Sequence, residues 1–177
     1  MSFDAFAGGF LNPLTVPAHL VALLGLGLLI GGQRDRGALV PWLAFALGLD
    51  TGLAAIALGA GQTPAIDILL AATVVSGLLV ALAIALPNAL CAGLALVTGV
   101  ALGLDSPPQA ISLAGATTAL IGTGLSACLT LALMVAGARA CTRDWQRIGL
   151  RILGSWIAAS AILVLALRFA RGMLFDT

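Results

Sequence analysis

The chain has 177 residues, of which 61% are hydrophobic and only 8% are charged. Globular domains carry about 25% charged residues, so a water-soluble fold of this composition could not cover its own surface. The formal net charge of +1 gives a nucleic-acid partner no electrostatic support. The mean hydropathy of +1.15 indicates an integral membrane protein instead. Its length allows five to seven helical spans of about 20 residues each.

Six apolar runs follow one another along the chain, separated by short segments rich in Pro, Gly, Asp and Arg, which are typical of helix ends. Backbone amides in hydrocarbon must be paired internally, so the runs are predicted to be α-helices. Short loops favour antiparallel neighbours. We therefore predict an all-α, polytopic membrane helix bundle that forms a single transmembrane domain over residues 1–177. The predicted spans are residues 14–32, 38–59, 66–86, 89–104, 111–138 and 148–169.

The arginines predict the orientation of this bundle. Two of them, Arg168 and Arg171, fall on one side, at the end of the last span and just beyond it, and the other six fall on the opposite side. Loops rich in basic residues stay in the cytoplasm. We therefore expect a multi-pass protein of the bacterial inner membrane with both termini outside, in the periplasm. The six arginines expected in the cytoplasm are Arg34, Arg36, Arg139, Arg143, Arg147 and Arg151.

Small residues recur at helical spacing in two of the predicted spans. Gly48 and Gly52 form one GxxxG pair, and Gly99 and Gly103 form another. Such pairs allow helix backbones to approach closely in lipid, although glycine is also common in membrane helices generally. We assign the four glycines to helix packing.

Asp50 is the one charged residue near the middle of the second predicted span. An ionised carboxylate there costs roughly 2.5–3.5 kcal/mol on insertion scales. Two interpretations follow. Asp50 belongs to a proton or cation pathway, or it makes a structural hydrogen bond to another helix.

His19, Asp67 and Asp105 are all expected at the outer side of the membrane. One imidazole and two carboxylates could bind a divalent cation weakly. The alternative is an interfacial histidine beside two helix-end aspartates, and the helix dipole alone favours Asp67 in the first turn of its helix.

The residues of the first span carry a family resemblance. In GGFLNPLTVPAHLVALLGLGLLIGG, the chain resembles the HupE/UreJ family through Gly9, Phe10 and His19, together with Pro13 and Leu14. Asn12 stands where that family has histidine, and Ala18 stands where it has aspartate. The resemblance implies a membrane protein tied to hydrogenase or urease maturation and a role as a nickel or cobalt permease.

The later spans keep the family's spacing but lose its histidines. In TGVALGLDSPP, Asp105 replaces a family glutamate, and Asp67 lies near another family acidic position. Of the metal ligands that the resemblance implies, His19 and these two acidic replacements remain. The positions of the family's histidines in this segment hold Thr98, Val100 and Leu102.

Two functional hypotheses remain open. The first is a non-catalytic accessory or structural subunit of a larger membrane complex, in contact with the lipid bilayer and with other membrane subunits or further copies of itself. The alternative is a HupE/UreJ-type permease for nickel, cobalt or another divalent cation, and no further cofactor is expected. The sequence contains no catalytic triad or phosphate-binding loop, so we predict no enzymatic activity.

Overall fold

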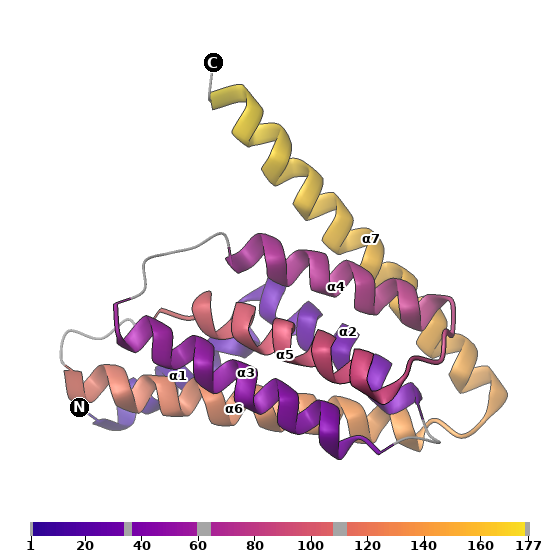
Figure 1. The fold of residues 1–177 in the computed structure, drawn as a ribbon, viewed down its shortest axis with the longest axis horizontal. Coiled ribbons are helices and arrows are strands. Elements are labelled where there is room, and N and C mark those ends of the chain that lie inside the picture. Colours follow the sequence, from indigo (N-terminus) through magenta and orange to yellow (C-terminus); the bar gives the residue numbers. More distant parts are fainter. Residues whose placement is uncertain (1, 34–36, 60–64, 108–112, 176–177) are drawn as a thin grey trace.

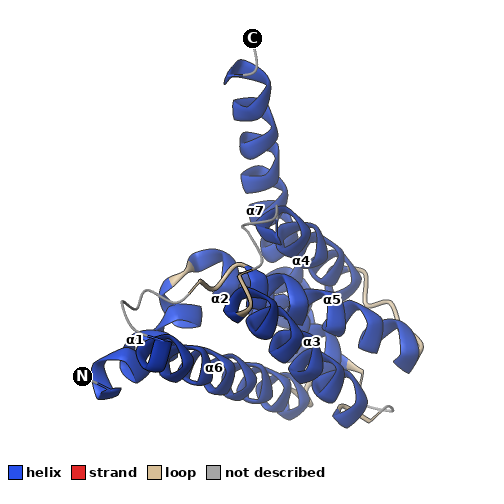
Figure 2. Ribbon diagram, turned by 60° about the vertical axis from the view of Figure 1, so that its left-hand side comes forward, coloured by secondary structure: helices blue, strands red, loops and turns tan. Residues whose placement is uncertain are grey.

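A computed structural model describes residues 2–33, 37–59, 65–107 and 113–175 of the chain. Within these ranges the regular structure is entirely helical (Figure 2). The helices are α1 (Ser2–Thr15), α2 (Pro17–Gly32), α3 (Leu39–Ala57), α4 (Ala65–Ala81), α5 (Asn88–Leu104), α6 (Leu113–Ala140) and α7 (Asp144–Phe175).

Helices α3, α4, α5 and α6 run alongside one another, and α2 lies among them (Figure 1). α3 packs on α5, α4 packs on α7, and α1 packs on α6. Most residues of α2 are buried, because it contacts α4, α6 and α7. Leu23 and Leu26 of α2 meet Phe45 and Leu49 of α3 and Leu131 of α6 in the main hydrophobic core. The predicted all-α bundle is therefore present.

The lengths of the described helices support fewer membrane spans than the six that we predicted. Three of the described helices, α3, α6 and α7, are long and apolar enough to cross a membrane, and the α1–α2 pair is a fourth candidate if it counts as one span. α4 and α5 are apolar but have only 17 residues each. At 1.5 Å per residue they are about 25 Å long, against a hydrocarbon core of about 30 Å.

The first predicted span is broken in the structure. Residues 2–15 form α1, and the axis of α2 is bent by 66° from that of α1 at a short break. Val16 adopts an extended conformation and Pro17 occupies the first position of α2. A proline disfavours the helical conformation of the residue before it, and its own fixed φ suits the start of a helix. The segment before the first span is thus a helix packed on α6.

The third predicted span ends five residues early, at Ala81 rather than at residue 86. The amide of Ile84 donates to the carbonyl of Leu79, and the amide of Ala83 donates to that of Val80. Ala83 has a φ of 52°. These bonds form a Schellman motif, which satisfies the last carbonyls of a helix and ends it. The prediction was wrong here because it took Pro87 as the helix-ending residue.

α7 is longer than the predicted 148–169 span at both ends. It packs on α4, for example where Gly154 lies against Val80, and its C-terminal end rises away from the bundle in both views (Figures 1 and 2). The first two residues of the predicted fifth span, 111 and 112, lie outside the described residues. The corresponding helix, α6, continues two residues past the predicted end, to Ala140.

Candidate cation site

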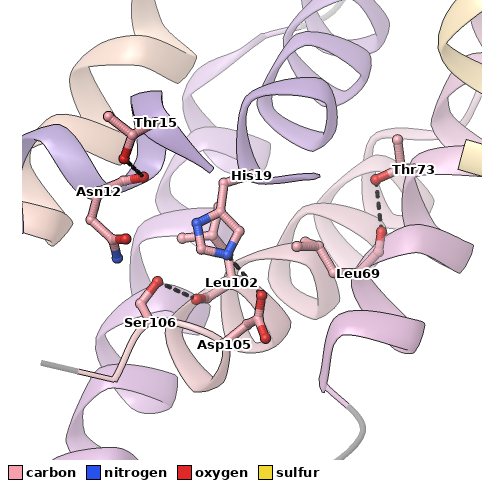
Figure 3. A network of polar contacts seen from close by, with 8 residues as sticks. All are labelled: Asn12, Thr15, His19, Leu69, Thr73, Leu102, Asp105 and Ser106. Carbon is pink, nitrogen blue, oxygen red and sulfur yellow. Dashed lines mark hydrogen bonds and ion pairs between the residues drawn. The ribbon is translucent and has the colours of Figure 1, made fainter. Parts of the chain in front are cut away.

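His19 lies in the first turn of α2 and is completely buried. Pro17 starts the helix, so the imidazole is held two residues after the bend between α1 and α2. Figure 3 shows the ring among Asn12 and Thr15 of α1, Leu102 of α5, and Asp105 and Ser106, which follow α5. The break in the first span therefore turns residues of α1 toward His19, and the C-terminal end of α5 lies on the same histidine.

Asp105 pairs with His19 across the bundle. The Nε2 atom of His19 lies 2.9 Å from Oδ2 of Asp105, and the two residues are 86 positions apart in the chain. Asp105 is the C-cap residue of α5, and its amide donates to the carbonyl of Ala101. An ionised carboxylate can only accept, so this bond assigns the proton of the ring to Nε2. The carboxylate also fixes the orientation of the imidazole.

The other ring nitrogen of His19, Nδ1, is buried and has no hydrogen-bond partner among the described residues. With the proton on Nε2, Nδ1 carries a lone pair. A buried polar atom without a partner costs about 1–3 kcal/mol. Histidines that bind metals commonly have this arrangement, in which a carboxylate accepts from one ring nitrogen and the other coordinates the ion.

Asp67 does not join His19 and Asp105 as a third ligand. Its Oδ1 lies 2.6 Å from Nε of Arg168, and both side chains are partly exposed. Arg168 of α7 is also within electrostatic range of Asp105. The structure thus places Asp67 at the same end of the bundle, but against a guanidinium. In the described part of the chain, no three His, Cys, Asp or Glu side chains are grouped closely enough to hold a metal ion.

The sequence analysis did not predict Arg168 as a residue of this site. It lies 101 positions from Asp67, and no local pattern links the two residues. The sequence signal that could have linked them was their expected depth in the membrane, because both residues were expected near its outer face. An arginine within the last predicted span, at the same face as predicted acidic residues, is a candidate for pairing with one of them.

Asp50 is exposed on the outside of the bundle rather than in its interior. It lies in α3, one of the helices long enough to span a membrane, and its carboxyl group is close enough to influence the thiol of Cys128 in α6 electrostatically. It makes no hydrogen bond or ion pair with another described residue. Asp50 is therefore separate from the His19–Asp105 pair and faces the surroundings of the bundle, which are lipid or another protein chain.

The four predicted packing glycines meet at the contact between α3 and α5. A methyl group at Gly103 would lie 2.7 Å from the carbonyl oxygen of Leu49, and one at Gly52 would lie 2.5 Å from that of Val100. Methyl groups at Gly48 and Gly99 would also overlap the backbone of the facing helix. Close backbone contact along this pair positions the C-terminal end of α5, which carries Asp105.

Comparison with known protein families gives a match to this chain. Residues 2–164 match the family described as HupE / UreJ protein, so the match covers nearly the whole chain. Curated proteins and solved structures give no match. Because the matched segment includes α1 to α6 and most of α7, the chain belongs to the HupE/UreJ family of membrane proteins.

Proposed function

We propose that this protein is a permease for a divalent transition-metal cation, with nickel and cobalt as the first candidates, in a bacterial inner membrane. Family membership supports a transport role, because the family is linked to nickel and cobalt transport. The observation that carries the proposal is the buried imidazole of His19, whose Nδ1 has no partner while Nε2 is held by Asp105. Imidazole nitrogen is a suitable ligand for nickel and for neighbouring first-row metals.

The small number of protein ligands fits transport better than storage. His19 supplies one nitrogen, Asp105 is engaged with the ring, and Asp67 is paired with Arg168. A cation held by one protein imidazole binds more weakly than a cation held by several protein ligands. Conduction requires a site from which the ion can leave as well as enter. In this proposal Asp105 positions His19, and His19 is the first coordinating group at the outer end.

Purified protein reconstituted in liposomes that contain a nickel-sensitive dye tests the proposal. We expect external nickel to raise the internal signal, and we expect His19→Gln to lower the rate at least tenfold, because glutamine lacks the imidazole ligand. The matched control is Thr73→Val. Thr73 is also buried, but its hydroxyl donates only to the carbonyl of Leu69 in its own helix.

Equal uptake by the wild-type protein and His19→Gln would exclude His19 as a cation ligand. Thermal unfolding of each variant in detergent separates loss of transport from loss of the fold. Uptake that is absent from the wild-type protein under a cation gradient would contradict the permease itself.

The exposed position of Asp50 favours a second candidate function, that of an accessory subunit in a larger membrane assembly. A carboxyl group on the outer surface of an apolar helix is unfavourable in lipid and more favourable against a polar group of another chain. Gentle purification tests this function. Partner chains in fixed ratio would support it, and a monodisperse monomer that transports nickel would contradict it.

A further inference from the structure

A cavity of about 630 Å³ opens at the end of the bundle opposite to His19. It lies where α2, α4 and α6 end and α7 begins, at the end shown at the right of Figure 1. Its volume is in the range of about 300–1000 Å³ that is typical of small-molecule sites. The proposed transport site does not use this cavity.

The lining of the cavity combines apolar and charged side chains. Leu28 and Leu29 of α2 and Val80 of α4 provide apolar wall. Asp144, Arg147 and Arg151 of α7 line the cavity as well. These three residues are spaced at i, i+3 and i+7, so they lie on one face of the helix. Such a combination suits an amphiphile, with a hydrocarbon part on the leucines and a charged part on α7.

The charges of the cavity suit a ligand that carries both signs. Arg147 and Arg151 supply two guanidinium groups, and Asp144 supplies one carboxylate one turn nearer to the start of α7. The C-terminal ends of α2, α4 and α6 add partial negative charge. The Nε of Arg151 donates to the carbonyl of Ala81, the last residue of α4, so Arg151 keeps its terminal amino groups for another acceptor. Arg147 has no side-chain bond to another described residue.

We propose that this cavity binds a phospholipid with a phosphoethanolamine headgroup. Its phosphodiester would accept from Arg147 and Arg151, its ammonium group would lie near Asp144 and the helix-end carbonyls, and the start of an acyl chain would cover Leu28, Leu29 and Val80. Guanidinium groups at the ends of membrane helices are suitable partners for lipid phosphates. The acidic residue selects a zwitterionic headgroup over a purely anionic one. This proposal is independent of nickel transport.

Native mass spectrometry of the detergent-purified protein tests the site. The protein is titrated with phosphatidylethanolamine, with phosphatidylglycerol, and with soluble glycerophosphoethanolamine or inorganic phosphate. We expect one phosphatidylethanolamine molecule to bind more tightly than phosphatidylglycerol, and the soluble compounds not to compete. Arg147→Gln should weaken the binding roughly tenfold or more, the effect of losing one charge-assisted hydrogen bond.

The matched control is Arg143→Gln, which removes an exposed arginine from the same end of the bundle but not from the cavity wall. It should leave lipid binding unchanged. Asp144→Asn should reverse the preference toward phosphatidylglycerol. Arg147→Gln is the main variant because Arg151 also ties α7 to α4, so its loss could disturb the fold.

Three results would each overturn the proposal. Equal weakening by Arg143→Gln and Arg147→Gln would mean that only surface charge matters. Tighter binding of phosphatidylglycerol by the wild-type protein would contradict the role of Asp144. Competition by the soluble phosphates at the same concentration as the lipid would mean that the apolar wall contributes nothing.

Discussion

At the scale of single residues, the pairing of His19 with Asp105 gives the two side chains different roles. The carboxylate holds the proton of the ring on Nε2, and this leaves Nδ1 as the atom that could bind a cation. His19 is therefore the one potential ligand of the pair, and Asp105 orients it. This difference leads to a specific expectation for Asp105.

Asp105→Asn should weaken nickel binding by about 10- to 100-fold, the effect that loss of a carboxylate supporting a metal-bound histidine usually has. An amide can donate to the ring as well as accept from it, so it no longer assigns the proton to Nε2. Asp105→Glu should retain most of the affinity, because it preserves the carboxylate. Isothermal titration of the purified variants with nickel measures the effect, and equal affinities of Asp105→Asn and the wild-type protein would contradict the positioning role.

Asp50 offers a second residue-scale prediction, because its environment decides the effect of replacing it. If lipid surrounds this face, Asp50→Leu should stabilise the bilayer-embedded protein by about 3 kcal/mol, since aspartate is unfavourable and leucine favourable on insertion scales. If another chain covers the face, the same change should dissociate the assembly. Size-exclusion chromatography with light scattering, together with thermal unfolding, distinguishes the two outcomes.

At the scale of helices, the pairing of α3 with α5 depends on the absence of side chains at the contact. Methyl groups at Gly48, Gly52, Gly99 or Gly103 would collide with the backbone of the facing helix, which cannot move aside as a side chain could. Dispersion contacts and close backbone approach replace the hydrophobic effect as the source of helix association in lipid.

Gly99→Ala should therefore destabilise the protein by about 1–3 kcal/mol, the usual cost of overpacking. Gly93 of the same helix provides the control, because nothing lies within 4 Å of a methyl group built there. Gly93→Ala should be neutral or stabilising by up to about 1 kcal/mol, through helix propensity alone. Unfolding in mixed micelles measures both changes, and equal effects of the two variants would show that the α3–α5 contact is not tight.

At the scale of the whole molecule, the basic residues are distributed unevenly between the two ends. Arg151 contacts the C-terminal end of α4 at Ala81, whereas Arg168 contacts the N-terminal end of the same helix at Asp67. Arg139, Arg143 and Arg147 accompany Arg151 at the ends of α6 and α7. By the positive-inside rule we expect this end of the bundle to lie in the cytoplasm.

Orientation can be measured with single cysteines in a background where Cys91, Cys128 and Cys141 are replaced by alanine. Leu58 lies at the exposed C-terminal end of α3, and Thr142 lies in the exposed turn between α6 and α7, so the two variants are Leu58→Cys and Thr142→Cys. A membrane-impermeant maleimide should label the first in intact spheroplasts and the second only after permeabilisation. The reverse pattern would show the opposite topology.

Much of the fold follows from local properties of the chain. Apolar runs predict helices because backbone groups in hydrocarbon must pair within the segment, and α3, α5 and α6 begin and end within about two residues of the predicted bounds wherever the ends are described. The exceptions have local causes that hydropathy does not register. Pro17 breaks the first run, and the Schellman motif at Ala83 ends α4 before the apolar run does.

The sequence by itself determined that this chain is an apolar helical membrane protein of the HupE/UreJ type, because composition, helix period and family pattern are properties of the chain alone. Only the tertiary structure decided that His19 meets Asp105, that Asp67 meets Arg168, and that Asp50 faces outward. These outcomes depend on how each helix is rotated about its axis. That rotation is set by close packing between helices distant in sequence, such as α3 on α5, and hydropathy carries no information about it.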